Sequence, residues 1–217
     1  MIISDSDRER LRNYLEQGVK DDVRLILFTQ EIECIFCKET NEIVQLLSSL
    51  SGKIKPEVYD FVKDAERAKG LKVDKIPAII PVGKREYGIR FYGIPSGYEF
   101  MSLVDAIIDV STGNTNLTEK TKQVVKTLNA PVHIQVFVTP TCPFCSKAVR
   151  LAHQLAVEST YIRADMVESV EFPQLAQRYA VMSVPKVVMN EKIEFVGALP
   201  EEHFVEHLLM AAQIAAS

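Results

Sequence analysis

The sequence predicts an α/β protein built from two similar units in tandem. Three observations support this fold class: the length of 217 residues, an internal repeat, and two Cys-x-x-C pairs that each lie between a predicted strand and a predicted helix. A chain of this length can form two domains of about 100 residues each. Its hydrophobic content of 47% is enough for each unit to bury a core of its own.

The internal repeat is centred on the cysteines. Cys34 and Cys142 are 108 residues apart, and Ile76-Pro77 aligns with Val184-Pro185 at the same spacing. A Phe-x-Gly motif follows in both halves at a spacing of 104, so the first half carries four extra residues before it: the motifs are Phe91-Tyr92-Gly93 and Phe195-Val196-Gly197. Several matches in the same order indicate a duplicated unit.

Residue periodicity predicts the elements of the first half. Ser6-Asp7-Arg8-Glu9 has the pattern of a capping box and is expected to start the first helix. The apolar run Val23–Phe28 is typical of a strand buried on both faces. The remaining elements are expected to be a helix after Cys34, a strand at 55–61, a helix at 64–69, strands at 78–80 and 90–92, and a helix at 100–110.

The second half repeats this order after a polar stretch, Ser111–Asn116, which has the composition of a linker. We therefore predict one unit at residues 1–115 and a second at 116–217. The elements expected in the second unit are a helix at 118–128, a strand at 132–138, a helix after Cys142, a strand at 161–164, a helix at 173–179, a hairpin of 187–189 with 193–195 across Asn190-Glu191, and a helix from Glu201.

All four cysteines lie in the pairs Cys34/Cys37 and Cys142/Cys145, which we predict to be catalytic redox centres. A structural disulfide scaffold would spread its cysteines along the chain. A thiol at a helix N-terminus meets unpaired backbone N–H groups, which favour its thiolate. Cys34 and Cys142 are therefore the expected nucleophiles, and Cys37 and Cys145, one turn into each helix, are expected to resolve the mixed disulfides.

The two sites are predicted to differ in reactivity. Near Cys142 the charged residues are Lys147 and Arg150, with no acid before Glu158 in the sequence. Cys34 is followed closely by Lys38 but is flanked by four acids: Glu31, Glu33, Glu39 and Glu42. Because nearby negative charge opposes thiolate formation, we expect Cys142 to be the more reactive nucleophile at neutral pH.

The two prolines supply the second signal. Ile76-Pro77 and Val184-Pro185 each follow a polar stretch and precede an apolar strand, 43 residues after the first cysteine of a pair. A proline at the same distance from a redox pair in both halves indicates a cis peptide bond packed against the sulfurs. The residues before the prolines, Ile76 and Val184, can offer their backbone to an extended substrate as an added strand. These four residues are the predicted substrate-binding positions.

A Cys-x-x-C that opens a helix, a hydrophobic-Pro 43 residues later, a hairpin and a glycine before the last helix resemble a thioredoxin-fold unit. Two such units in one short chain resemble the protein disulfide oxidoreductases of hyperthermophilic archaea and bacteria, also called glutaredoxin-like proteins. The N-terminal part of bacterial alkyl hydroperoxide reductase flavoproteins is built similarly. The resemblance implies two tandem thioredoxin-fold units, each a mixed central sheet flanked by helices, with the two sheets joined edge to edge.

The resemblance also implies an activity and partners. It implies dithiol–disulfide exchange on protein thiols and disulfides, with no cofactor beyond the redox-active disulfides. A flavin-dependent electron donor of the thioredoxin-reductase type is the implied partner, and a peroxiredoxin is a further candidate. An alternative role is an electron relay from such a flavoprotein to a peroxidase, and a non-enzymatic alternative is a zinc or iron–sulfur module that uses the same cysteines.

The sequence departs from related families at two places. Thioredoxins keep a buried carboxylate six residues before the first cysteine, where this chain has Phe28 and Val136. Glu31, Glu33 and water remain the candidate proton acceptors. Glutaredoxins bind glutathione with a Gly-Gly pair, where this chain has Gly93-Ile94 and Gly197-Ala198, so glutathione is not an expected substrate.

Charge and composition exclude several other classes of function. The formal net charge of −4 gives no reason to expect nucleic acid or anionic lipid as a partner. No apolar run approaches the roughly 20 residues that span a bilayer, and Met1–Asp5 does not resemble a secretory signal, so we expect a cytoplasmic protein. His203 and His207 share a helix face but lack further ligands nearby, so no metal site is predicted.

Overall fold

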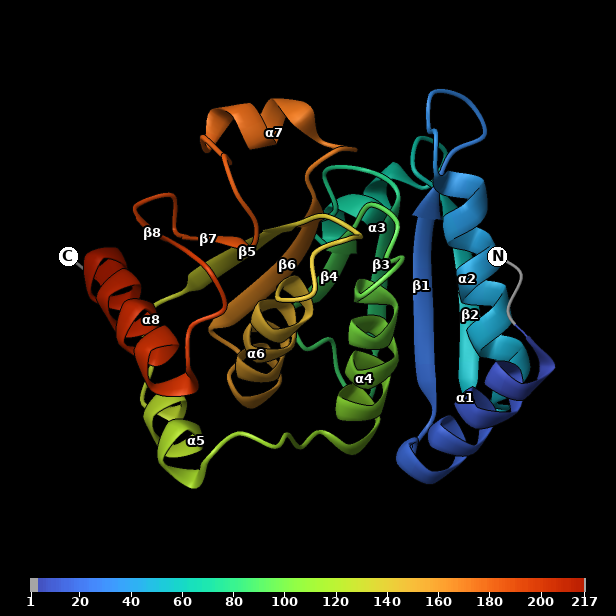
Figure 1. Ribbon diagram of the computed structural model, residues 1–217, viewed down its shortest axis with the longest axis horizontal. Helices are drawn as coiled ribbons and strands as arrows, with labels where there is room; N and C mark the ends of the chain where they lie inside the picture. Colours follow the sequence, from blue (N-terminus) through green and yellow to red (C-terminus); the bar gives the residue numbers. More distant parts are fainter. Residues whose placement is uncertain (1–3, 217) are drawn as a thin grey trace.

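The computed structural model describes residues 4–216, and in this part of the chain the strands form one eight-stranded mixed sheet (Figure 1). The spatial order is β2-β1-β3-β4-β6-β5-β7-β8. The strands are β1 (Val23–Thr29), β2 (Ile54–Asp60), β3 (Ala78–Val82), β4 (Ile89–Tyr92), β5 (Val132–Val138), β6 (Ile162–Glu168), β7 (Lys186–Met189) and β8 (Ile193–Val196).

The strand order shows the repeat directly. In the first half β1 pairs parallel with β2 and antiparallel with β3, and β3 pairs antiparallel with β4. In the second half β5 has the same relation to β6 and β7, and β7 pairs with β8. The halves join where β4 pairs parallel with β6, with Phe91 opposite Met166. The predicted joining of two mixed sheets edge to edge is confirmed.

Helices cover both faces of the sheet, but unequally. Buried side chains of α1, α2, α4, α5, α6 and α8 pack on one face, whereas α3 and α7 cover part of the other. The helices are α1 (Asp5–Gly18), α2 (Cys37–Leu50), α3 (Ala65–Gly70), α4 (Glu99–Thr112), α5 (Glu119–Lys126), α6 (Cys145–Glu158), α7 (Pro173–Arg178) and α8 (Glu201–Ala216).

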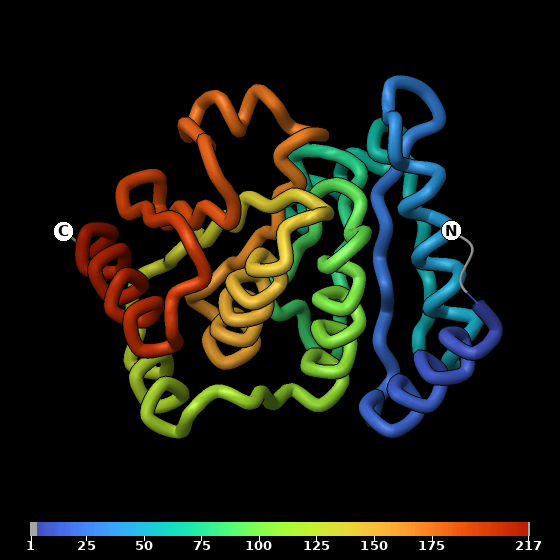
Figure 2. Tube along the Cα trace, in the orientation of Figure 1, coloured from blue at the N-terminus to red at the C-terminus, as the bar shows by residue number. Residues whose placement is uncertain are grey.

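One continuous hydrophobic core runs through both halves. It contains Phe91 and Val104 of the first half together with Leu155 and Met166 of the second. Helices α4 and α6 lie side by side at the centre of the molecule (Figure 1). The predicted boundary between residues 115 and 116 falls in the connection from α4 to α5, which Figure 2 shows as the yellow-green stretch at the lower edge. We retain 1–115 and 116–217 as a proposed division of the repeat.

Two predicted element boundaries are wrong for identifiable reasons. The first helix begins at Asp5 because Ser4, not Ser6, is the N-cap, and its hydroxyl accepts a hydrogen bond of 3.1 Å from the Asp7 N–H. Strand β6 extends four residues beyond Ala164, since Asp165 and Glu168 are buried in the strand although they interrupt its apolar pattern.

Candidate active site

Both cysteine pairs lie in strand-to-helix loops at the same edge of the sheet. Strands β1 and β5 run in the same direction, because the pairings that connect them through β3, β4 and β6 reverse the direction twice. Cys34 follows β1 and Cys142 follows β5. Each pair forms a disulfide, and the Cα atoms within each pair are 5.5 Å apart.

The second cysteine of each pair is the first residue of its helix. α2 begins at Cys37 and α6 at Cys145, so the expectation that these residues lie one turn into the helix is wrong. A left-handed backbone at Glu33 (φ 61°) and a turn closed by the Cys142 N–H to Thr139 carbonyl bond hold both first cysteines in the preceding loop. Cys37 and Cys145 are almost fully buried, whereas Cys34 is half-buried. At the first pair the more accessible cysteine is therefore Cys34, in the loop, whereas at the second pair Cys142 is itself only 9% exposed.

The predicted prolines border the same edge. The peptide bonds Ile76-Pro77 and Val184-Pro185 are both cis. The Val184 carbonyl oxygen lies 3.6 Å from Cys142 Sγ, close enough to accept a hydrogen bond from a thiol there once the disulfide is reduced. The repeated glycines fix this arrangement, because the N–H of Gly197 donates to the Pro185 carbonyl (2.8 Å) and that of Gly93 to the Pro77 carbonyl (3.0 Å).

A buried carboxylate that sequence reasoning missed lies near the loop that carries Cys142. Helices α4 and α6 run parallel: Asp109 bonds Arg150, 41 residues away, and Thr115, three residues after α4, bonds Glu158 at the end of α6, 43 residues away. The Tyr98 N–H donates to the Pro140 carbonyl at the start of both helices (3.3 Å). This arrangement places Glu99, the first residue of α4, near the loop that carries Cys142.

Glu99 has the properties expected of a proton acceptor. Its side chain is 1% exposed, and neither carboxylate oxygen has a hydrogen-bonded partner among the described residues. Burial raises the pKa of Glu99 to about 7, and the nearby Ser102 hydroxyl offsets this only in part. The carboxylates of Glu31 and Glu33, the candidates named from the sequence, belong to exposed residues near the other pair.

The charges around Cys142 differ from those expected from its own helix. Arg150 Nη1 lies 2.5 Å from Asp109, and its Nε lies 3.3 Å from Asp105, so two acids of α4 neutralise this arginine. The sequence has no acid between Cys142 and Glu158, but in the structure acids of the other half, on α4, face this helix. Lys147 is the exposed cation that remains near Cys142. The higher reactivity of Cys142 stays a prediction, with weaker electrostatic support.

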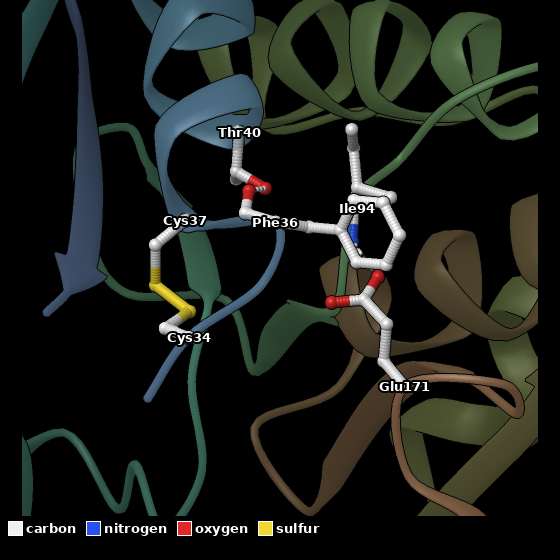
Figure 3. The surroundings of a disulfide bond; sticks show 6 residues. All are labelled: Cys34, Phe36, Cys37, Thr40, Ile94 and Glu171. Carbon is white, nitrogen blue, oxygen red and sulfur yellow. Dashed lines mark hydrogen bonds between the residues drawn. A yellow bond between two sulfur atoms is a disulfide. The ribbon is translucent and has the colours of Figure 1, made fainter. Parts of the chain in front are cut away.

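The second half also borders the Cys34/Cys37 pair (Figure 3). The backbone carbonyl of Phe36, between the two cysteines, accepts hydrogen bonds from the Thr40 hydroxyl (2.7 Å) and from the Thr40 N–H (2.9 Å). These bonds fix the start of α2. Its ring lies next to Ile94 and Glu171 (Figure 3). The Glu171 carboxylate accepts a 2.6 Å hydrogen bond from the Ile94 N–H, and burial, with nearby Glu168, raises the pKa of Glu171 to about 7. No sequence pattern pointed to Glu171, which follows β6 in the other unit.

The arrangement of the described side chains does not favour metal binding. Within residues 4–216 no group of three or more His, Cys, Asp or Glu side chains could hold a metal ion, so the two cysteine pairs do not form one four-cysteine site. His203 and His207 bond to Glu206 and to the His203 carbonyl on an exposed helix face. Of the described helices, none combines the length and the apolar character needed to cross a bilayer.

Known proteins share this architecture. Residues 132–210 match the thioredoxin domain family. The crystal structure of a protein disulfide oxidoreductase from Aeropyrum pernix is 32% identical, with a TM-score of 0.91, and the match covers 98% of this chain and 95% of that one. The chain belongs to the protein disulfide oxidoreductases. It is accordingly a thiol–disulfide oxidoreductase with two Cys-x-x-C sites.

A second group of similar proteins shares the fold of this protein disulfide oxidoreductase. The N-terminal domain of the alkyl hydroperoxide reductase AhpF from Enterococcus faecalis is 25% identical with a TM-score of 0.88, and the match covers 95% of this chain and all of that one. The corresponding alkyl hydroperoxide reductase of Staphylococcus aureus is 28% identical over 153 residues, 70% of this chain. The chain spans roughly a third of the length of the curated relatives it matches, 28% for the staphylococcal protein.

Proposed function

We propose that the protein forms, reduces or isomerises disulfides of other proteins at both Cys-x-x-C sites. Cys34 and Cys142 act as nucleophiles, and Cys37 and Cys145 act as resolving residues. The observation that carries this proposal is the arrangement at the second site: Cys145 is fully buried at the start of α6, Cys142 lies in the preceding loop at 9% exposed, and the Val184 carbonyl is 3.6 Å from Cys142 Sγ. A backbone carbonyl beside the reactive sulfur suits an extended polypeptide added as a strand.

In the reducing direction, the Cys142 thiolate attacks one sulfur of the substrate disulfide. A new S–S bond joins Cys142 to the substrate, the substrate S–S bond breaks, and the other substrate sulfur leaves as a thiolate. The Cys145 thiolate then attacks Cys142 Sγ, which releases the second substrate thiolate. The substrate gains two electrons and the pair Cys142/Cys145 becomes the disulfide, so the oxidising direction is the reverse of these steps.

A proton acceptor is needed to convert Cys145 from a buried thiol to a thiolate. We assign this role to Glu99, whose unpartnered carboxylate begins α4 near the Cys142 loop. With a pKa of about 7 it can both accept and return a proton near neutral pH. It takes the place of the carboxylate that thioredoxins carry at the position of Val136 in this chain.

Apolar side chains around both sites support a protein substrate. Ile32 and Ile35 are 70% and 85% exposed beside Cys34, and Phe144 and Met182 are 60% and 92% exposed near Cys142 and Val184. Exposed apolar groups of this size are typical of protein-binding surfaces. We propose that Ile76, Pro77, Val184 and Pro185 form the substrate-binding backbone, and that the bound segment is extended and partly apolar.

A relay is the second candidate function, favoured by the similarity to the alkyl hydroperoxide reductases. In this role a flavin-dependent reductase reduces one pair, that pair reduces the other, and the second reduces a peroxiredoxin. Vicinal cysteines that cycle between dithiol and disulfide suit a reducing compartment, so we place the protein in the cytoplasm. The chain's own disulfides are the only redox groups that this scheme requires of it.

Insulin reduction and refolding of scrambled ribonuclease test the proposal. The double variant Cys34→Ser/Cys142→Ser should lose both activities, whereas each single variant should retain the part carried by the other site. Wild-type activity in the double variant would refute dithiol exchange at these sites. The reduction potential of each pair separates the roles, because a net oxidant should lie well above the roughly −270 mV of thioredoxin and a reducing relay near or below it.

A further inference from the structure

A cleft of about 420 Å³ lies at the opposite edge of the sheet from the cysteines. It opens at the N-terminal ends of β4, β5 and β6, where the halves join, and both halves contribute to its walls. Strand β5 begins beside the cleft at Val132 and leads to Cys142 at its other end. Its length separates the cleft from the redox site by roughly 20 Å.

Most of the charged groups at the cleft are cationic. They are Lys72, Arg85, Arg90, Arg163 and His133, with Glu86 as the acid among them. Two of the arginines are already neutralised. Arg163 bonds both oxygens of Asp165, which is fully buried and also bonds His133 (2.6 Å). Arg90 Nη1 lies 3.5 Å from Glu86.

Lys72 and Arg85 carry the uncompensated charge. Among residues 4–216 neither has a carboxylate within ion-pair distance. Arg85 donates to the Val157 carbonyl (2.9 Å) and stacks over the Tyr87 ring, which holds its guanidinium at the cleft. Lys72 occupies a left-handed turn (φ 54°) after α3, directly beside the cleft. The cleft therefore presents a net charge of about +2.

A third cation lies deeper in the same wall. The Arg90 side chain is only 3% exposed, and its Nε and Nη2 both donate to the Leu71 carbonyl. Its Nη1 has no hydrogen bond within the described part of the chain. It lies 3.5 Å from Glu86, which makes an ion pair with it but no hydrogen bond. This guanidinium is therefore a buried positive charge behind the cleft wall, with Glu86 as the acid beside it.

We propose that this cleft binds a small phosphate-bearing dianion between Lys72 and Arg85. Two unpaired cations match the charge of a phosphomonoester at neutral pH, and guanidinium N–H groups fit phosphate oxygens. The cleft is larger than one phosphate ion, and Tyr87 and Tyr161 line it beside the charges, so it has room for the organic part of an ester.

Calorimetric titration of the full chain at constant ionic strength tests the proposal, with glycerol phosphate and inorganic phosphate as separate probes. We expect saturable one-to-one binding of glycerol phosphate. Lys72→Gln and Arg85→Gln should each weaken it roughly tenfold or more, since each removes a charged hydrogen bond. Lys120→Gln, which removes an exposed lysine outside the cleft, is the matched control and should bind like the wild type.

The titration distinguishes an ester site from a phosphate site and from the absence of a site. Tighter binding of glycerol phosphate than of inorganic phosphate identifies an ester site, and equal binding identifies the phosphate group itself as the ligand. Absence of saturable binding with either probe, or equal weakening by Lys120→Gln, overturns the proposal. Insulin reduction by the Lys72 and Arg85 variants should be unchanged, and retained thermal unfolding temperatures show that they fold.

Discussion

At the scale of single residues, two buried carboxylates lie near the loops that carry the redox pairs. Glu99 and Glu171 both carry a pKa of about 7 because burial disfavours their charged forms. Glu99 begins α4 of the first half and lies near the Cys142 loop, and Glu171 follows β6 of the second half and lies near the Cys34 loop. Their protonation therefore links the pH of the medium to both the chemistry and the stability of the protein.

Glu99→Gln should affect stability and reactivity in opposite directions. The folded-state pKa of Glu99 lies above its ordinary value of 4.5, so wild-type stability falls as the pH rises from 4.5 to 7. The glutamine variant avoids this loss and should be more stable than the wild type at pH 8 by up to about 3 kcal/mol, with little difference at pH 4.5. Urea unfolding at both pH values measures this.

The same substitution should slow disulfide exchange at the second site. Insulin reduction by Glu99→Gln in a Cys34→Ser background should fall by roughly 10²-fold or more near pH 7, as expected for loss of a general base. Glu31→Gln, an exposed glutamate beside the other pair, is the matched control. Unchanged activity in Glu99→Gln, with the wild-type pH profile, would remove Glu99 from the mechanism.

His153 should make the protein sensitive to acid. It is fully buried against Phe91, and burial, with nearby Arg150, lowers its pKa to about 3. The folded-state pKa of His153 is below its unfolded value of 6.5. The unfolded chain therefore binds a proton here that the folded protein does not, and the free energy of unfolding falls as the pH drops from 6.5 toward 3. His153→Leu should therefore unfold less readily at pH 4 by up to about 3 kcal/mol relative to wild type. A parallel pH dependence of both proteins in urea unfolding would contradict this.

At the scale of elements, the repeated glycines after β4 and β8 offer a matched comparison. Gly93 and Gly197 both have positive φ, 88° and 101°, and both donate to a cis-proline carbonyl. A Cβ at Gly93 would lie 2.6 Å from the Glu168 Cβ and 2.7 Å from a Glu171 oxygen, whereas nothing lies within 4 Å of one at Gly197. The surroundings of these equivalent positions have diverged because the first half packs against the second.

Gly93→Ala should therefore destabilise the protein more than Gly197→Ala. Both variants incur the backbone cost of a left-handed alanine, about 1–2 kcal/mol. Only Gly93→Ala adds a clash, which costs about a further 1–3 kcal/mol. Chemical unfolding of the two variants measures the difference, and equal losses would show that the Glu168–Glu171 loop moves aside freely.

At the scale of the whole molecule, the shared core predicts that the two units unfold together. The β4–β6 pairing and the α4–α6 contact bury surfaces that belong to both halves. The chain contains no tryptophan, so Tyr14→Trp in α1 and Tyr161→Trp before β6 can each report on one half. Both fluorescence transitions should coincide in urea. Separate midpoints would show two independent domains.

The repeat and its local periodicity were enough to predict the architecture of each unit. The prolines at equal spacing from the cysteines predicted the cis bonds, and the family resemblance carried by these motifs implied the joining of the two sheets, and both agree with the structure. The surroundings of the sulfurs were not predictable in this way. Glu99 lies near the Cys142 loop and Asp109 neutralises Arg150 only because α4 and α6 run parallel and side by side. Nothing in the sequence of α6 specifies which acids lie across from it.

The connection from β4 to α4 touches the surroundings of both centres. Ile94 holds Glu171 beside Phe36, Gly97 and Tyr98 abut Pro140, and Glu99 ends the stretch near the Cys142 loop. Gene duplication ordinarily frees one copy of a unit to drift while the other keeps the original task. Here one short connection contacts residues near both cysteine pairs, so we expect a substitution in it to alter the surroundings of both sites and the two copies to evolve together.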